Sequence, residues 1–87
     1  KDVMFYVEDG SAATTNILHA AWAHGLGTCW VSGDKRPYAD EVRAYLGAPE
    51  GQRLVSLVPL GHPAQDGGPD RSDDKRTAED VIHWDRF

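Results

Sequence analysis

The distribution of charge along the chain predicts a long buried helix. Between Gly10 and Gly33 no residue carries a formal charge, and alanine recurs through the first half of this stretch. A helix without charge on any side is normally buried on all of its sides. We therefore expect a central buried helix at about 12–24, with Glu8 and Asp9 favourably placed near its positive end.

Shorter apolar runs predict the remaining elements. The segment from Val3 to Val7 is apolar and rich in β-branched and aromatic residues, which is typical of extended chain. We expect a strand at about 28–32, a helix at about 37–46 and a second strand at about 53–60. The second strand is apolar along nearly its whole length, as in strands covered on both faces. Proline cannot donate to a strand ladder, so Pro59 interrupts this strand or lies at an edge. Together these elements predict an α+β fold.

The chain divides into a main part, residues 1–62, and a C-terminal arm with a docking segment, residues 63–87. Proline, glycine and a run of mixed charge occupy the first half of the arm, which is typical of a solvated connection. Apolar residues then return and require a surface on which to dock, which a neighbouring subunit would supply. They are Val81, Ile82, Trp84 and Phe87.

Composition narrows the class of protein. The chain has 87 residues, 40% of them hydrophobic and 26% charged, as in ordinary globular proteins. Its formal net charge of −5 argues against nucleic acid as a main partner. Polar residues interrupt the long apolar stretch, so we expect no membrane span. The single cysteine excludes an internal disulfide and favours a cytoplasmic location. Because Lys1 stands first, we interpret the chain as a fragment, a processed product or one subunit of a split protein.

The segment that follows the long helix carries the main candidate for chemistry. A β-prone run closes on Ser32 and Gly33, where bare backbone N–H groups can approach a ligand. This segment is open to two interpretations, an ordinary strand-to-loop turn and a site for a flat cofactor. Trp30 is either core or a residue packed near that cofactor, and Cys29 is best interpreted as a small buried hydrophobe.

Other kinds of site lack their sequence signals. The helical positions of His19 and His24 differ by about 140°, and neither His62 nor His83 has a partner at ligand spacing. We therefore expect no metal site. The chain has no P-loop and no GxGxxG motif. It also has no catalytic triad or carboxylate pair, so we expect no catalytic acid, base or nucleophile.

Four segments occur in an order and spacing that resemble one known family. They are EDGSAATTNILHAAWAHGLGTCWVSG at 8–33, DKRPYADEVRAYLGAPEG at 34–51, LVSLVPLGHP at 54–63 and EDVIHWDRF at 79–87. This set resembles the C-terminal half of the nitroreductase family of FMN-dependent oxidoreductases. The Arg/Ser-rich phosphate-binding segment of that family's N-terminal half has no counterpart in this sequence.

The resemblance implies a nitroreductase-like fold, with the central helix packed on a sheet rich in antiparallel pairs. It also implies a C-terminal arm that crosses to a partner subunit. The partner would be a second copy in a homodimer, or another chain that carries the missing N-terminal half.

The resemblance further implies a site and an activity. Residues of the 28–33 segment would contact FMN, with backbone N–H groups directed at the flavin N5 and O4 edge, and Lys75, Arg76 or both would contact its phosphate. The implied members of the first group are Trp30, Val31, Ser32 and Gly33. NADH or NADPH would reduce the flavin, and a small-molecule acceptor such as a nitroaromatic or quinone would take the electrons. Lys35 and Arg36 either face solvent or attract the anionic nicotinamide cofactor.

A second class of function also fits the sequence. The chain is short and has no catalytic side chains of its own. Both features are also expected of a non-catalytic half or small subunit that completes a flavin site or assembly with another chain. Flavin colour in the purified protein separates the two interpretations.

Overall fold

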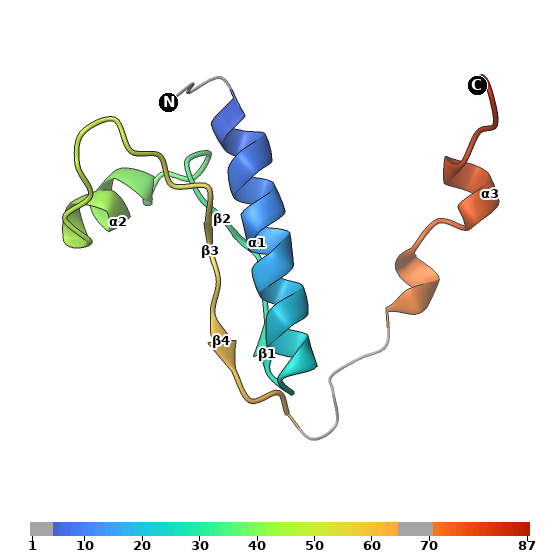
Figure 1. The fold of residues 1–87 in the computed structure, drawn as a ribbon, viewed down its shortest axis with the longest axis horizontal. Helices are drawn as coiled ribbons and strands as arrows, with labels where there is room; N and C mark the ends of the chain where they lie inside the picture. Colours follow the sequence, from blue (N-terminus) through green and yellow to red (C-terminus); the bar gives the residue numbers. More distant parts are fainter. Residues whose placement is uncertain (1–4, 65–70) are drawn as a thin grey trace.

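The computed structural model describes residues 5–64 and 71–87 of the chain, which forms a small α+β unit with a separate C-terminal segment (Figure 1). Its radius of gyration is 16.8 Å, against about 12 Å expected for a compact chain of this length. The elements follow in the order α1 (Tyr6–Ala23), β1 (Gly27–Thr28), β2 (Val31–Ser32), α2 (Ala39–Tyr45), β3 (Ser56–Leu57), β4 (Leu60–Gly61), η2 (Ser72–Asp74) and α3 (Ala78–Val81).

Helix α1 is longer than the sequence predicts. It begins at Tyr6, directly after Phe5, so Tyr6 and Val7 are helical rather than extended. Phe5 is not extended either, and Val3 and Met4 lie outside the described residues. Glu8 and Asp9 fall in its first turn, where the helix dipole favours negative charge. The β-propensity of two residues does not outweigh the propagation of a helix already stabilised by the alanines that follow.

The end of α1 is fixed by a glycine turn. Gly25 adopts a φ of +78°, which favours a residue without a Cβ. Its N–H donates to the Trp22 carbonyl at 2.9 Å, and the Leu26 N–H donates to the Ala21 carbonyl at 2.9 Å. These two bonds form a Schellman motif, which turns the chain back along the helix into β1.

The four strands form one interrupted antiparallel ribbon beside α1 (Figure 1). Gly27 pairs with Gly61 and Thr28 with Leu60, whereas Val31 pairs with Leu57 and Ser32 with Ser56. The β1–β4 and β2–β3 pairings share one register, because the same number of residues separates them on each side of the ribbon. The interruption falls at Pro59, as the sequence predicts. The expected strands at 28–32 and 53–60 are therefore each divided into two short pieces.

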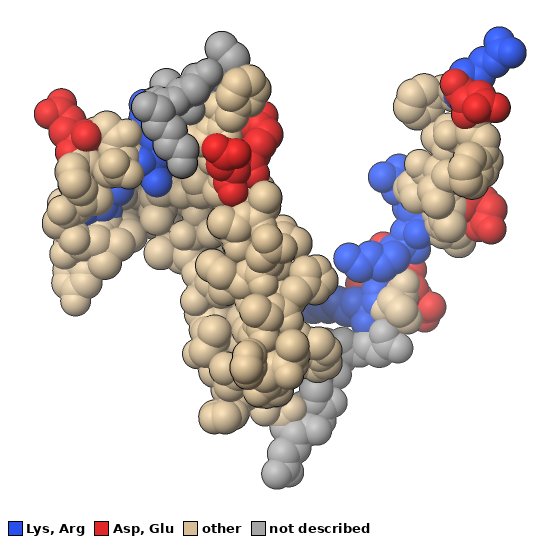
Figure 2. Space-filling view, in the orientation of Figure 1, with Lys and Arg blue, Asp and Glu red and all other residues tan. Residues whose placement is uncertain are grey.

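The expectation that α1 is buried on all sides is wrong for the chain on its own. Only Thr14 and Ala21 of this helix are buried, and Ala20 is exposed, because the ribbon covers one face of the helix. The second strand is likewise not covered on both faces, since its described residues are half-buried or exposed. Figure 2 shows that the body around the C-terminal half of α1 presents a face without charged side chains. The exposed large apolar residues of 5–64 are Phe5, Val7, Ile17, Trp22, Trp30, Tyr45, Leu46 and Leu60.

The expected helix at about 37–46 is confirmed as α2, with Asp40 and Glu41 in its first turn. Arg43 of this helix forms ion pairs with Asp34 and Asp40. The pair with Asp34 ties α2 to the end of β2, since its two side chains are only 24% and 19% exposed.

The C-terminal segment, residues 71–87, lies apart from α1 and the ribbon (Figure 1). All of its residues are exposed, including the apolar side chains that the sequence assigns to docking. The rings of His83 and Phe87 lie 4.8 Å apart and make a local contact within this segment. Part of the expected connecting arm, residues 65–70, falls outside the described residues.

Candidate functional site

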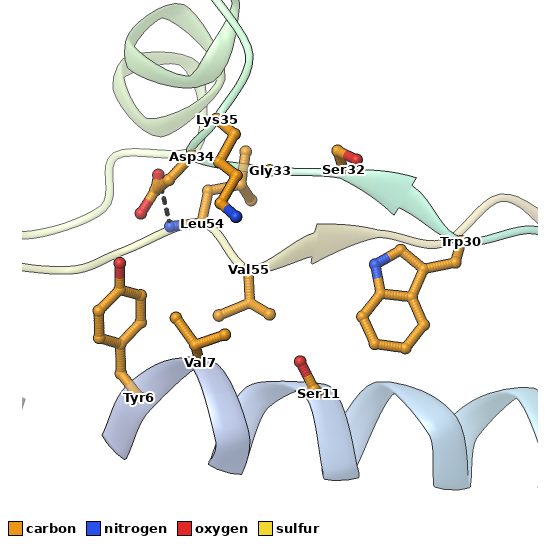
Figure 3. Close-up of a pocket in the computed structure, with 10 residues that line it drawn as sticks. All are labelled: Tyr6, Val7, Ser11, Trp30, Ser32, Gly33, Asp34, Lys35, Leu54 and Val55. Atoms are coloured by element: carbon orange, nitrogen blue, oxygen red, sulfur yellow. Dashed lines mark hydrogen bonds between the residues drawn. The ribbon is translucent and has the colours of Figure 1, made fainter. Parts of the chain in front are cut away.

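A pocket of about 180 Å³ lies between the N-terminal half of α1 and the β2–β3 end of the ribbon (Figure 3). Figure 3 shows Trp30 at one end of the pocket and Tyr6 at the other, with Val55 directed toward the helix. The pocket is lined by Tyr6, Val7, Ser11, Trp30, Ser32, Gly33, Asp34, Lys35, Leu54 and Val55.

Gly33 is required by a close approach of two backbones. A Cβ added at this residue would lie 2.0 Å from the Leu54 carbonyl oxygen and 2.7 Å from the Val55 carbonyl carbon. No side chain fits at that distance from backbone atoms. The absence of a Cβ at Gly33 therefore has a structural cause within the chain, whatever ligand the pocket holds.

The N–H of Gly33 is directed away from the partner strand. The Asp34 N–H donates to the Leu54 carbonyl at 2.6 Å, and hydrogen-bonded pairs alternate along an antiparallel ladder. That alternation turns the N–H of Ser32 toward Ser56 and the N–H of Gly33 outward. Among the residues that the structure describes, the Gly33 N–H has no hydrogen-bond partner, although Gly33 is buried. Buried N–H groups are nearly always paired, so this donor is a candidate point of contact for a ligand.

Asp34 fixes the loop immediately after Gly33. One of its carboxylate oxygens accepts a hydrogen bond from the Leu54 N–H at 3.0 Å and also pairs with the Arg43 guanidinium. The other oxygen, Oδ2, is buried without a partner among the described residues. The Arg36 N–H donates to the Gly33 carbonyl at 2.9 Å and closes the turn. The loop beside the pocket is thus held by side-chain and backbone bonds together.

The residues that the sequence assigns to the cofactor fall in three places. Trp30, Ser32 and Gly33 line the pocket, whereas Val31 does not. Lys75 and Arg76 are exposed on the C-terminal segment, apart from the pocket of their own chain (Figure 1). The structure therefore brings together three of the six expected residues.

Two expectations about neighbouring side chains change. Cys29 is exposed rather than buried, because it lies at the interruption of the ribbon. Trp30 is 39% exposed and lines the pocket, so it is not a core residue of this chain.

Residues from other elements complete the pocket, and the local sequence pattern did not predict them. Tyr6, Val7 and Ser11 come from α1, and Leu54 and Val55 come from the segment directly before β3, opposite Gly33. The missed signal was the antiparallel pairing itself, which places residues 54–56 against residues 32–34. Lys35, expected either in solvent or near an anionic cofactor, lines the pocket mouth with an exposed side chain.

Neither a metal-ion cluster nor a membrane-spanning helix occurs in the part of the chain that the structure describes. Within residues 5–64 and 71–87, no three histidine, cysteine or acidic side chains gather closely enough to hold a metal ion. Across those residues, no helix has the length and apolarity needed to cross a bilayer.

Proteins of similar sequence share one description. The chain is 37% identical over 83 residues to a protein of Archaeoglobus fulgidus, covering 94% of this chain and 47% of that protein. It is 40% identical over 67 residues to a protein of Methanothermobacter thermautotrophicus, covering 74% and 34% respectively. Both are named "Putative NADH dehydrogenase/NAD(P)H nitroreductase".

The fold is also similar to a solved structure. A crystal structure from Bacteroides thetaiotaomicron with the same name matches with a TM-score of 0.77 and 33% identity, covering 97% of this chain and 48% of that one. The chain thus spans about a third to a half of the length of these proteins. The Nitroreductase family model matches residues 4–62, which is more than half of the chain. The chain therefore belongs to the nitroreductase family.

Proposed function

We propose that the chain is part of an FMN-dependent NAD(P)H oxidoreductase that acts in the cytoplasm. The observation that carries the proposal is Gly33, a buried residue that lines the pocket and whose N–H has no hydrogen-bond partner among the described residues. When bound, FMN supplies the redox chemistry, which is hydride uptake from NADH or NADPH and electron delivery to a nitroaromatic, quinone or similar acceptor.

The pocket has the chemistry that a flavin ring requires. An isoalloxazine edge carries hydrogen-bond acceptors whose negative charge grows on reduction, and a fixed N–H donor stabilises that charge. The backbone N–H of Gly33 offers such a donor. Trp30 presents an aromatic surface at the same pocket. The side chains would bind and orient the ring, and none of them needs to act as an acid or base.

The size of the pocket supports an incomplete site. Sites for ligands of this size usually enclose about 300–1,000 Å³, and the pocket beside Gly33 encloses about 180 Å³. One chain therefore supplies one wall. We propose that the other wall belongs to the part of the protein that relatives have and this chain lacks, or to a second copy.

Assembly with a partner is part of the proposal. The C-terminal segment carries four large apolar side chains that are exposed in the isolated chain, and Phe87 is fully so, at 104%. The chain also has a larger radius than a compact chain of equal length. We propose that residues 79–87 dock on a partner subunit and that Lys75 or Arg76 reaches the FMN phosphate there. The partner is a second copy in a homodimer or a chain with the missing half.

The test is a flavin titration of the purified native protein that contains this chain. We expect bound flavin to co-purify, to be released on unfolding, and to be reduced by NADH or NADPH. Ser32→Ala keeps the backbone and should bind FMN as tightly as wild type. A colourless protein that gives no spectral change with FMN would contradict the proposal.

The alternative is a non-catalytic half that completes the flavin site of another chain. It is supported by the fraction of its relatives that the chain covers. It predicts that residues 1–87 alone bind no flavin, and that adding a chain with the N-terminal half restores both binding and reduction.

A further inference from the structure

The hydroxyl of Tyr38 makes a hydrogen bond that the proposed function does not yet use. It donates to the Ser32 carbonyl oxygen at 2.5 Å, across six positions of the chain. Tyr38 directly precedes α2, whereas Ser32 ends β2. The bond therefore connects the second helix to the strand that forms the pocket.

The Ser32 carbonyl and the Gly33 N–H belong to one peptide group. The described chain has no cis peptide bond, so the C=O and N–H of this group point in opposite directions. A donor held on the carbonyl side consequently fixes the direction of the N–H on the other side. Withdrawal of electron density by the hydroxyl also polarises the N–H and makes it a stronger donor.

We propose that Tyr38 is a positioning residue that aims and polarises the Gly33 N–H for a ring acceptor in the pocket. The inference rests on the proposed function, because the ligand it assumes is the oxidised or reduced flavin ring. Tyr38 acts through the peptide and need not touch the ligand.

The surroundings keep the Tyr38 hydroxyl in place. Arg43, on the helix that follows Tyr38, pairs with Asp34, which itself follows Gly33 in the chain. Asp34 in turn bonds the Leu54 N–H through its side chain and the Leu54 carbonyl through its backbone. The peptide between Ser32 and Gly33 is thus held by Tyr38 and by the pairing of Ser32 with Ser56, and the next residue is held by Asp34. Such anchoring makes the direction of the N–H a property of the fold before any ligand binds.

The first arm of the test needs no flavin. Ser32–Gly33 is the only Ser-Gly peptide within residues 1–87, so serine labelled at its carbonyl with ¹³C and glycine labelled with ¹⁵N mark one peptide of this chain. The native protein is compared with Tyr38→Phe, which removes only the hydroxyl, and with Tyr45→Phe, an equal change at a side chain that is 90% exposed. Loss of the signal in Ser32→Ala confirms its assignment. We expect Tyr38→Phe, and not Tyr45→Phe, to shift the Ser32 carbonyl and Gly33 amide signals.

The second arm measures the flavin. Tyr38→Phe should weaken the binding of reduced FMN about fivefold more than that of oxidised FMN, the size of one ordinary hydrogen bond. This corresponds to a two-electron potential lower by about 20 mV. A purely structural role would weaken both redox states alike and leave the potential unchanged.

The possible results distinguish a failure of the Tyr38 inference from a failure of the proposed flavin function. Unchanged carbonyl and amide signals in Tyr38→Phe would overturn the inference, as would a shifted signal with an unchanged potential in a protein that binds FMN normally. Both of those results leave the proposed function intact. A wild-type protein that binds no flavin would overturn both.

Discussion

The hydroxyl of Thr14 lies 2.7 Å from the hydroxyl of Ser56 and joins the middle of α1 to β3. Thr14 is 4% exposed, and its own proton is donated to the Gly10 carbonyl at 2.8 Å. Ser56 is therefore the donor and Thr14 the acceptor. Because Ser56 pairs with Ser32, this bond sets the distance between the helix and the ribbon at the pocket.

Replacing Thr14 with valine should destabilise the protein. Valine keeps the shape and the β-branch but leaves the Ser56 hydroxyl without its acceptor, which costs about 1–3 kcal/mol. Urea unfolding of the native protein measures the change. Thr15→Val, on an exposed position of the same helix, should have little effect. Equal losses in the two variants would show that the hydroxyl pair contributes nothing.

Gly33→Ala should destabilise the protein strongly, because the new Cβ would overlap the Leu54 carbonyl oxygen. Overpacking usually costs about 1–3 kcal/mol, and a clash with backbone belongs at the upper end of that range. Gly61→Ala is the control, since its added Cβ meets nothing within 4 Å. Thermal unfolding of both variants checks the prediction. A Gly33→Ala protein as stable as the control would mean that the two backbones do not approach so closely.

The C-terminal segment should contribute to assembly of the native protein. Trp84→Ala with Phe87→Ala removes two large apolar side chains, each contributing about 1.5–3 kcal/mol when fully buried. Sedimentation velocity over a dilution series should show dissociation at a higher protein concentration than in the wild type. Glu79→Ala with Asp80→Ala, at exposed positions of the same segment, serves as the polar control. If the aromatic variant sediments as the wild type does, the docking proposal is wrong.

Removing the charges of Lys75 and Arg76 should weaken FMN binding. The double alanine variant loses attraction to the phosphate, and this loss should be larger at low salt because ions screen such interactions. Fluorescence titration at two ionic strengths measures it. Arg53→Ala with Arg71→Ala changes the net charge equally at other exposed positions. If the control variant loses as much affinity for FMN, the loss comes from the change in net charge and not from a contact of Lys75 or Arg76 with the phosphate.

Local features of the fold were predictable from the sequence. The stop of α1 at Gly25 and the interruption at Pro59 depend on backbone restrictions that act within a few residues. The second helix follows from an apolar spacing that is also local. Ser32 and Gly33 were expected at the site from the same kind of signal, and both line the pocket.

Features that depend on distant partners were not predictable. The absence of charge from Gly10 to Gly33 indicated a helix buried on all sides, but the chain itself covers only one face of α1. The contact between Gly33 and Leu54 depends on strand register across 21 positions, which no local pattern encodes. The same holds for the hydrogen bond from Tyr38 to Ser32. The apolar spacing of the second helix predicts a large apolar side chain at position 38 but says nothing about the partner of its hydroxyl.

The strand pairs on both sides of Pro59 share one register. An inserted residue therefore has different consequences at different places along the chain. Neighbouring residues of a strand face opposite sides, so one residue added between Thr28 and Val31 would turn Ser32 away from the pocket and bring Val31 toward it. An addition in the turn at 47–52, after α2, leaves every strand pair as it is. Homologues and engineered variants should therefore differ in length at that turn and keep a fixed number of residues beside Cys29 and Trp30.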